Sequence, residues 1–367
     1  MEPEPYRDRV VELTSELIEY RSTEDRPEEI DACMDHIAGV LDDAGITYSR
    51  HRSDDVPSLV ASLDGTQTPD VLFHGHIDVV PAPEQMFTPR IEDNELYGRG
   101  SADMKGGVAA MVHVFTDLAR LDPPPSVGLM IVGDEERGGL HGARHLLQEG
   151  YRPGFCITGE PNNLAGEMDI IIKQKGIIHL EITATGQAAH AATPENGENA
   201  IEKLMGAYPA IRSVFDDYDD DWRPTVNFGT VSGGDVINQV PDVATVELDI
   251  RFPDQGTRDD ILLELRNIPS IEVKSTGEGN PVDTDPTDPH VQGLKRHARA
   301  AIGSHVKFAN KPHASDLRHF AKEGIPGVAF GPEAYGSHEQ FERLLLDSLE
   351  PYCQTLYAFG AETPYTA

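Results

Sequence analysis

Apolar residues recur at helical spacing near the N-terminus and gather into short uninterrupted runs further along the chain. Over 10–18 and again over 30–41 they return every three or four residues, which predicts two amphipathic helices, and a longer helix is predicted over 104–121. Short apolar runs predict buried strands at 58–61, 71–73 and 127–132. Helices that alternate with buried strands predict an α/β fold in which the sheet is covered.

The pattern changes near residue 176. The following segments predict, in chain order, a strand over 177–185, a helix over 199–215, strands over 225–231 and 243–251, a helix over 259–265 and a strand over 271–274. This β-α-β-β-α-β order is the ferredoxin-like pattern, so residues 176–282 are predicted to form an inserted α+β domain.

The Gly-, Pro-, Asp- and Thr-rich stretch 276–288 is predicted to be the linker that returns from the inserted domain. The alternation then resumes over 291–302, 316–322, 328–330 and 341–358. We therefore expect residues 1–175 and 283–367 to form one domain together.

The charge balance of the chain is extreme. It carries 63 acidic and 30 basic side chains, a formal net charge of −33, and Arg outnumbers Lys 21 to 9. A surface this negative repels nucleic acids and anionic membranes, so neither is expected as a partner. We interpret the excess as adaptation to high salt, where counterions screen the self-repulsion. The less favoured alternative is an ion- or partner-binding role for the Asp run over 216–221.

The three cysteines, Cys33, Cys156 and Cys353, are odd in number and not spaced as pairs, so a disulfide framework is not expected. The chain begins Met-Glu-Pro-Glu with no basic segment and no apolar run, and about 18 consecutive apolar residues occur nowhere. These features predict a protein of the reducing cytoplasm.

Two stretches place metal-type ligands beside predicted strands or helices. His76 and Asp78 stand two apart at the end of a strand, so Asp78 can reach the imidazole and fix its tautomer; a pair of satisfied polar residues is an equally good interpretation of this stretch alone. Asp103 lies in the glycine-rich segment 98–107 at the start of a helix, where a carboxylate can bridge two cations. A dinucleotide fingerprint is excluded because its third glycine is absent.

Two further strands are followed by acids. Asp134, Glu135 and Glu136 come after the apolar run 127–132, and Glu160 comes after another short strand. Adjacent carboxylates repel, which is tolerable if one coordinates a cation and another handles a proton. A solvated acidic loop is the alternative. Strand-end acids of this kind favour one shared pocket beyond the carboxyl ends of the sheet.

These segments resemble the zinc-dependent aminoacyl amidohydrolase family that includes acetylornithine deacetylase, succinyl-diaminopimelate desuccinylase, aminoacylase and the carboxypeptidase G type. The family motifs occur here in order as His76-x-Asp78, Gly98-Arg-Gly-x-x-Asp103-Met-Lys-Gly, Glu135-Glu136 and Gly159-Glu160-Pro161. The resemblance implies a mixed-sheet, zinc-peptidase-like catalytic domain with helices on both faces, and an inserted lid and dimerisation domain.

The resemblance also implies roles for single residues. His76 and Glu160 would hold one zinc ion, Glu136 and His338 the other, and Asp103 would bridge the two. Asp78 would orient His76, and Glu135 would be the general base.

Later segments agree with the family pattern. His190 resembles the lid-domain histidine that stabilises the oxyanion, usually in the partner subunit, although the family usually has Ser where Ala191 and Ala192 stand. Polar contacts to the substrate are implied for Asn238, Arg251, Ser315 and Arg318. A guanidinium matches both oxygens of a carboxylate, so Arg251 or Arg318 is expected to bind the substrate's α-carboxylate.

The expected activity is removal of an acyl group from an N-acyl amino acid by a homodimeric enzyme with two zinc ions, of the acetylornithine deacetylase or succinyl-diaminopimelate desuccinylase type. Cobalt or manganese could replace zinc. A dipeptidase or carboxypeptidase of the same fold acting on short peptides remains the alternative. A non-catalytic binding protein is less favoured because Glu135 accompanies a full ligand set.

Overall fold

The computed structural model describes residues 5–161, 168–216, 218 and 221–365. Asp217, Asp219 and Asp220 of the acidic run lie outside the described residues. The chain divides into two compact units. Unit 1 comprises residues 1–173, 283–311 and 315–367, and unit 2 comprises residues 174–282 and 312–314.

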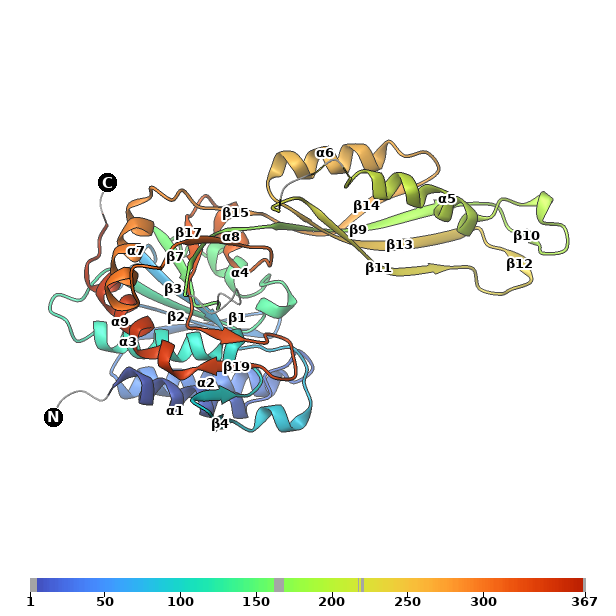
Figure 1. The fold of residues 1–367 in the computed structure, drawn as a ribbon. Helices are drawn as coiled ribbons and strands as arrows, with labels where there is room; N and C mark the ends of the chain where they lie inside the picture. Colours follow the sequence, from blue (N-terminus) through green and yellow to red (C-terminus); the bar gives the residue numbers. More distant parts are fainter. Residues whose placement is uncertain (1–4, 162–167, 217, 219–220, 366–367) are drawn as a thin grey trace. The chain divides into compact units, whose positions relative to one another are not determined.

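A mixed sheet runs through unit 1 (Figure 1). Its described strands follow the order β1-β2-β6-β3-β7-β17-β8-β15, with β16 paired to β8. The bounds are Tyr48–Ser53 (β1), Val56–Ser62 (β2), Val71–His76 (β3), Val127–Val132 (β6), Phe155–Thr158 (β7), Ile170–Gln174 (β8), Val282–Asp283 (β15), Phe308–Lys311 (β16) and Gly327–Ala329 (β17). Strands β6, β3, β7 and β17 are parallel, whereas β1, β2 and β8 pair antiparallel. The predicted mixed sheet is confirmed.

Helices cover both faces of this sheet (Figure 1). One face carries α1 (Tyr6–Glu19), α2 (Pro27–Asp43), α3 (Gly106–Leu118), α7 (Pro289–Ala301) and α9 (Leu349–Ala361). The other carries α4 (Ala143–Gln148) and α8 (Leu317–Lys322). Helix α3 contacts strands, α1 and α9 at once and is buried almost all round, which is why its sequence is apolar on every side. It begins two residues later than predicted because 101–105 form an irregular turn.

A second, small sheet in unit 1 has the order β18-β19-β5-β4. Its strands are Arg90–Glu92 (β4), Glu95–Tyr97 (β5), Ala334–Tyr335 (β18) and Arg343–Leu345 (β19). Pairing of Arg343 with Tyr97 joins segments that are almost 250 positions apart in the sequence. The predicted element over 341–358 is therefore two elements, β19 and α9.

Unit 2 has the predicted β-α-β-β-α-β order. Its elements are Gly176–Thr185 (β9), Ala200–Ser213 (α5), Thr225–Gly233 (β11), Val243–Phe252 (β13), Gln255–Arg266 (α6) and Glu272–Gly279 (β14). The antiparallel sheet follows the order β11-β13-β9-β14, with α5 and α6 on one face (Figure 1). Burial alternates along β9 and β13, so the helix-covered face forms the core and the other face is more exposed.

The predicted linker over 276–288 is wrong at its start. Strand β14 continues to Gly279 because its backbone pairs with β9 throughout, across a bulge between Ser275 and Gly277. Ladder hydrogen bonds thus outweigh the low strand propensity of glycine.

Two further findings concern membrane-spanning helices and the cysteines. In the part of the chain that the structure describes, no helix combines the length and apolarity needed to cross a membrane. Cys33, Cys156 and Cys353 are all buried free thiols.

Candidate active site

Three neighbouring parallel strands deliver ligand-type side chains to one edge of the large sheet. β3 lies between β6 and β7. His76 is the last residue of β3, Glu135 and Glu136 follow β6, and Glu160 follows β7. Because the carboxyl ends of parallel strands meet at the same edge, local sequence order is enough to gather these side chains.

Asp103 faces two imidazoles with its two oxygens. Its Oδ1 lies 3.2 Å from His76 Nε2, and its Oδ2 lies 3.5 Å from His338 Nε2. Glu160 Oε1 lies 3.3 Å from the same His76 nitrogen, and Glu136 Oε1 lies 3.1 Å from the same His338 nitrogen. Each imidazole nitrogen therefore faces one oxygen of Asp103 and one of a glutamate.

The potential ligand atoms form two groups, one of His76, Glu135 and Glu160 and the other of Asp103, Glu136 and His338. Within each group they lie within 4.8 Å of one another. Imidazole nitrogens mixed with carboxylate oxygens suit zinc and other divalent transition metals. The donor set therefore fits two cations, with Asp103 reaching toward both groups.

Burial and close packing shift the pKa values of these side chains. Burial raises the pKa of Glu135, with Asp316 adding to the effect, and burial also raises the pKa of Glu136. Hydrogen bonds to Asp103 and Glu136 raise the pKa of His338 to about 10. A cation bound here would compete with protons for these side chains, because metal ligands bind in their deprotonated form.

Asp78 organises more of the site than the sequence indicated. His76 Nδ1 lies 3.0 Å from the backbone carbonyl of Asp78 and 3.5 Å from its Oδ1. The carboxylate of Asp78 also accepts the backbone N–H groups of Glu135 and Glu136, at 3.1 and 3.0 Å. One side chain therefore holds the glutamate pair as well as lying beside the histidine.

Two glycines let the backbone segments of the site approach closely. A Cβ on Gly107 would stand 2.3 Å from the carbonyl oxygen of Gly159, and one on Gly331 would stand 2.4 Å from the same oxygen. Real Cβ atoms do not come so near, so larger residues would push the start of α3 away from Glu160.

Glu135 lies beside a group of charged residues from α8. Arg318 Nη1 is 3.7 Å from Glu135 Oε1, and Arg318 Nη2 is 3.7 Å from Asp316 Oδ1. The fully buried Asp316 also lies 3.3 Å from His74 Nε2. Ser315 is buried, and its hydroxyl accepts the N–H of Leu317 at 3.4 Å, at the start of α8. The structure thus places Arg318 next to Glu135.

The sequence left four neighbours of the site without a role: His74, Lys311, Asp316 and Glu342. Lys311 is buried, and its ammonium lies 3.6 Å from Glu160 Oε2 and donates to the carbonyl of Pro161. His74 could have been noticed, since it stands two residues before His76 on the same side of β3. Lys311 carries no comparable signal.

His338 is held in an unusual backbone conformation. Its φ is +67°, in the left-handed region, where a non-glycine residue costs on the order of 1–3 kcal/mol. Its side chain is 51% exposed, in contrast to the buried His76. The loop around it must therefore be fixed by other contacts.

Unit 2 carries the remaining predicted residues. His190 and Asn238 lie together: Ala191 donates its N–H to the carbonyl of Asn238, and His190 pairs with Gln239 across β10 (Ala189–His190) and β12 (Gln239–Val240). The Nδ1 of His190 accepts the N–H of Ala192 at 3.0 Å, which directs the opposite ring nitrogen, Nε2, outward as the donor.

Arg251 lies apart from this pair. It stands near the opposite end of β13, about 26 Å along the strand from Val243 at ~3.3 Å per residue. Its guanidinium is bound by both oxygens of Asp249, at 2.7 and 2.9 Å. A substrate carboxylate would have to compete with Asp249, so Arg251 is the weaker of the two predicted arginines.

Comparison with known proteins identifies the family of this chain. Residues 72–362 match the family described as Peptidase family M20/M25/M40. The chain belongs to this family. It is therefore a hydrolase that acts on amide bonds, and the resemblance inferred from the motifs is confirmed.

Among curated relatives, a succinyl-diaminopimelate desuccinylase of Acidiphilium cryptum (strain JF-5) is 34% identical over 360 residues, 92% of this chain and 94% of that protein. Among solved structures, the aminopeptidase PepT from Bacillus cereus ATCC 10987 aligns with a TM-score of 0.78 at 19% identity, covering 97% of this chain and 98% of that one. The Bacillus subtilis YXEP protein, a dinuclear metal binding peptidase, aligns with a TM-score of 0.73 at 16% identity over 97% and 98%. These two likenesses support the fold.

Proposed function

We propose that this enzyme removes an acyl group from an N-acyl amino acid and that it uses two divalent cations, which we expect to be zinc ions. The observation that carries the proposal is the placement of Asp103 between two imidazoles. Its Oδ1 lies 3.2 Å from His76 Nε2, and its Oδ2 lies 3.5 Å from His338 Nε2. The desuccinylase relative favours the succinyl-diaminopimelate type of substrate and hence a role in amino-acid biosynthesis.

His76, Asp103, Glu136, Glu160 and His338 would hold the cations. Bound there, the cations would supply the Lewis acidity that polarises an amide carbonyl and acidifies water. The residues of the chain then divide the remaining work. Glu135 accepts the proton of the attacking water and returns it to the departing nitrogen, a task suited to a buried carboxylate whose pKa is raised by burial.

Arg318 is the residue that we assign to the substrate's carboxylate. It belongs to the same unit as Glu135 and lies 3.7 Å from it, so a carboxylate bound to Arg318 would place the neighbouring amide beside the base. Asp78 keeps Glu135 in position through the backbone. Asn238 and Arg251 remain secondary candidates for substrate contact.

A side-by-side assay tests the substrate class. N-succinyl-diaminopimelate, N-acetylornithine and a panel of dipeptides and tripeptides would be offered to the metal-loaded enzyme, with Glu135→Gln as the control for contaminating activity. We expect hydrolysis of an N-acyl amino acid to exceed that of every peptide. Faster cleavage of peptides would make the enzyme a peptidase, and zinc binding without any hydrolysis would contradict catalysis.

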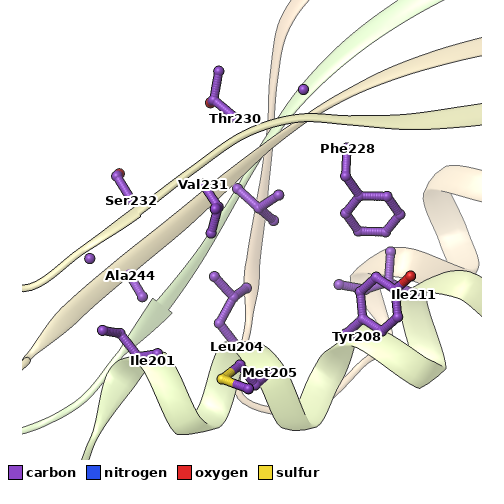
Figure 2. Close-up of a pocket in the computed structure, with 13 residues that line it drawn as sticks. Ile201, Leu204, Met205, Tyr208, Ile211, Phe228, Thr230, Val231, Ser232 and Ala244 are labelled. Atoms are coloured by element: carbon purple, nitrogen blue, oxygen red, sulfur yellow. The ribbon is translucent and has the colours of Figure 1, made fainter.

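The proposal includes a homodimer formed through unit 2. A groove of about 670 Å³ lies between α5 and β11, and its lining carries no charged side chain (Figure 2). Met205 is 70% exposed and Val231 is 75% exposed on these two elements. Apolar exposure beside the edge strand β11 supports burial against a second copy.

In such a dimer His190 would act on the partner's substrate by stabilising the oxyanion. His190 lies beyond the far end of β9, a ten-residue strand that begins next to the crossing into unit 2 and spans about 33 Å at ~3.3 Å per residue. A side chain this far from the segment that joins the two units is suited to act in the active site of another copy of the chain. Cytoplasmic location and adaptation to high salt complete the proposal and rest on the free thiols and the charge of −33.

A further inference from the structure

Glu342 joins two segments that carry metal-type ligands, although it belongs to neither group of potential ligands. The side chain is buried, with only 1% exposure. Its Oε1 accepts backbone N–H groups from Gly100, Ala102 and Asp103, at 2.9, 3.1 and 3.0 Å. Its Oε2 accepts from the guanidinium of buried Arg99. The carboxylate is thus saturated by the turn that carries Asp103.

Strand pairing sets up this contact. Arg343 of β19 lies opposite Tyr97 of β5, so the residue before Arg343 lies beside the residues after Tyr97. The backbone agrees, since Gly98 donates its N–H to the carbonyl of Glu342 at 3.3 Å. The glycine-rich turn therefore surrounds the carboxylate of Glu342.

The other ligand lies four residues earlier on the same loop. His338 has a left-handed backbone and a half-exposed ring that contacts Glu136 and Asp103. A turn in which Glu339 donates to the carbonyl of Gly336 shapes the loop, and Glu342 fastens its end to the Asp103 turn. The separation between Asp103 and His338 is therefore fixed through Glu342.

We propose that Glu342 is a positioning residue for the metal group of Asp103, Glu136 and His338, an inference that rests on the proposed two-metal function. Two of the three members of that group stand on segments that Glu342 joins. The group of His76, Glu135 and Glu160 stands on strand ends held by the large sheet. Asp103 also faces His76, so loss of the Glu342 carboxylate should weaken both metal positions. The position of Asp103, Glu136 and His338 should weaken more, because two of its three ligands stand on the joined segments.

The main variant is Glu342→Gln, which keeps the size of the side chain, removes its charge and turns an amide NH₂ toward Arg99 or the turn. Outer partners of metal ligands typically contribute 10–100-fold to metal affinity. Zn²⁺ titrated into metal-free protein against a chromophoric chelator should give two ions per chain in the wild type. In Glu342→Gln one ion should bind about 10–100-fold more weakly, and the other should weaken by a smaller factor because it shares Asp103. Co²⁺ titration should show the same split in the visible spectrum.

Three further variants distinguish loss of the positioning role from general destabilisation of the fold. Glu339→Gln removes an exposed charge from the same loop and should bind both ions as the wild type does. Leu41→Ala truncates a buried side chain of α2 and should lower the melting temperature without splitting the two affinities. Arg99→Met combined with Glu342→Gln removes both buried charges and should keep the split if Glu342→Gln alone folds poorly.

Hydrogen exchange of the metal-free protein distinguishes failure of this inference from failure of the proposed function. Amides of Gly100, Ala102 and Asp103 should exchange faster in Glu342→Gln than in the wild type, with no metal involved. Unchanged exchange, or equal weakening of both ions in Glu342→Gln, would overturn the positioning role. Fewer than two ions in the wild type would overturn the two-metal function, and the inference about metal affinity with it.

Discussion

Glu135 and Glu136 are neighbours of the same type, and replacing each with Gln should produce opposite defects. The backbone N–H groups of both bond to Asp78, so either substitution leaves the turn in place. Glu136 Oε1 faces His338 Nε2 at 3.1 Å, within the second metal group. Glu135 Oε1 lies 3.7 Å from Arg318 Nη1, and its carboxylate belongs to the other group, with His76 and Glu160. Its proposed task is to exchange a proton.

The expected magnitude follows from these contacts. Glu135→Gln removes the proton acceptor, which should lower kcat about 10²–10⁴-fold, or roughly 2.7–5.4 kcal/mol of barrier at ~1.36 kcal/mol per tenfold. Burial raises the pKa of Glu135, so a neutral amide at this position should cost the fold little. Glu136→Gln should instead lose affinity for one cation and recover part of its activity at high metal concentration.

Metal content per chain after removal of free metal, followed by kcat and KM at saturating zinc, would separate the two variants. The reasoning predicts two ions and almost no turnover for Glu135→Gln, against a lost ion for Glu136→Gln. Turnover of Glu135→Gln within about tenfold of the wild type would refute its role as the base. Loss of metal from both variants alike would refute the division of labour.

Two other measurements test separate parts of the proposal, and a third tests the pH dependence of folding stability. Because the net charge is −33, the melting temperature should rise with added potassium chloride, and a flat or falling curve would contradict adaptation to salt. His190→Ala and Glu135→Gln subunits should each be inactive but regain activity when mixed, since one site of the heterodimer is then intact; no recovery after proven exchange would contradict supply of His190 by the partner. Burial, with Arg9 adding to it, lowers the pKa of His113 from 6.5 to about 4, so the stability gained from its neutral form is present above pH 6.5 and lost as the pH falls toward 4. In denaturant titrations over that pH range, the free energy of unfolding of the metal-free wild type should fall by up to about 3 kcal/mol more than that of His113→Gln. Equal decreases in the two proteins would contradict the lowered pKa of His113.

The strand-end residues were predictable because their positions depend on short-range sequence order. An apolar run ends, the chain leaves the sheet, and a ligand stands within a few residues, as for His76, Glu136 and Glu160. Because neighbouring parallel strands end at the same edge of the sheet, these ligands come together there. The ferredoxin-like order of unit 2 was predictable for a similar reason, since alternation along β9 and β13 is a local property.

Contacts between distant segments were not predictable in this way. Glu342 had no predicted role, because nothing near it in sequence indicates the turn at 100–103 that its carboxylate binds. Arg251 was expected at the substrate, but Asp249, two residues away on the same face of β13, already binds its guanidinium. The pairing of Arg251 with Asp249 follows from their spacing along the strand, and the contact of Arg251 with substrate stays a prediction.

The acids of the site divide into two kinds, and the division explains how so many can be gathered. Asp103, Glu136 and Glu160 face imidazoles and the positions where cations would bind. Asp78 and Glu342 face backbone N–H groups of the two turns that carry those ligands. A carboxylate bound to several backbone amides fixes the turn around it. The turns that carry Asp103 and Glu136 are therefore ordered by carboxyl groups that do not compete for metal, so binding a cation need not supply the free energy of ordering these turns.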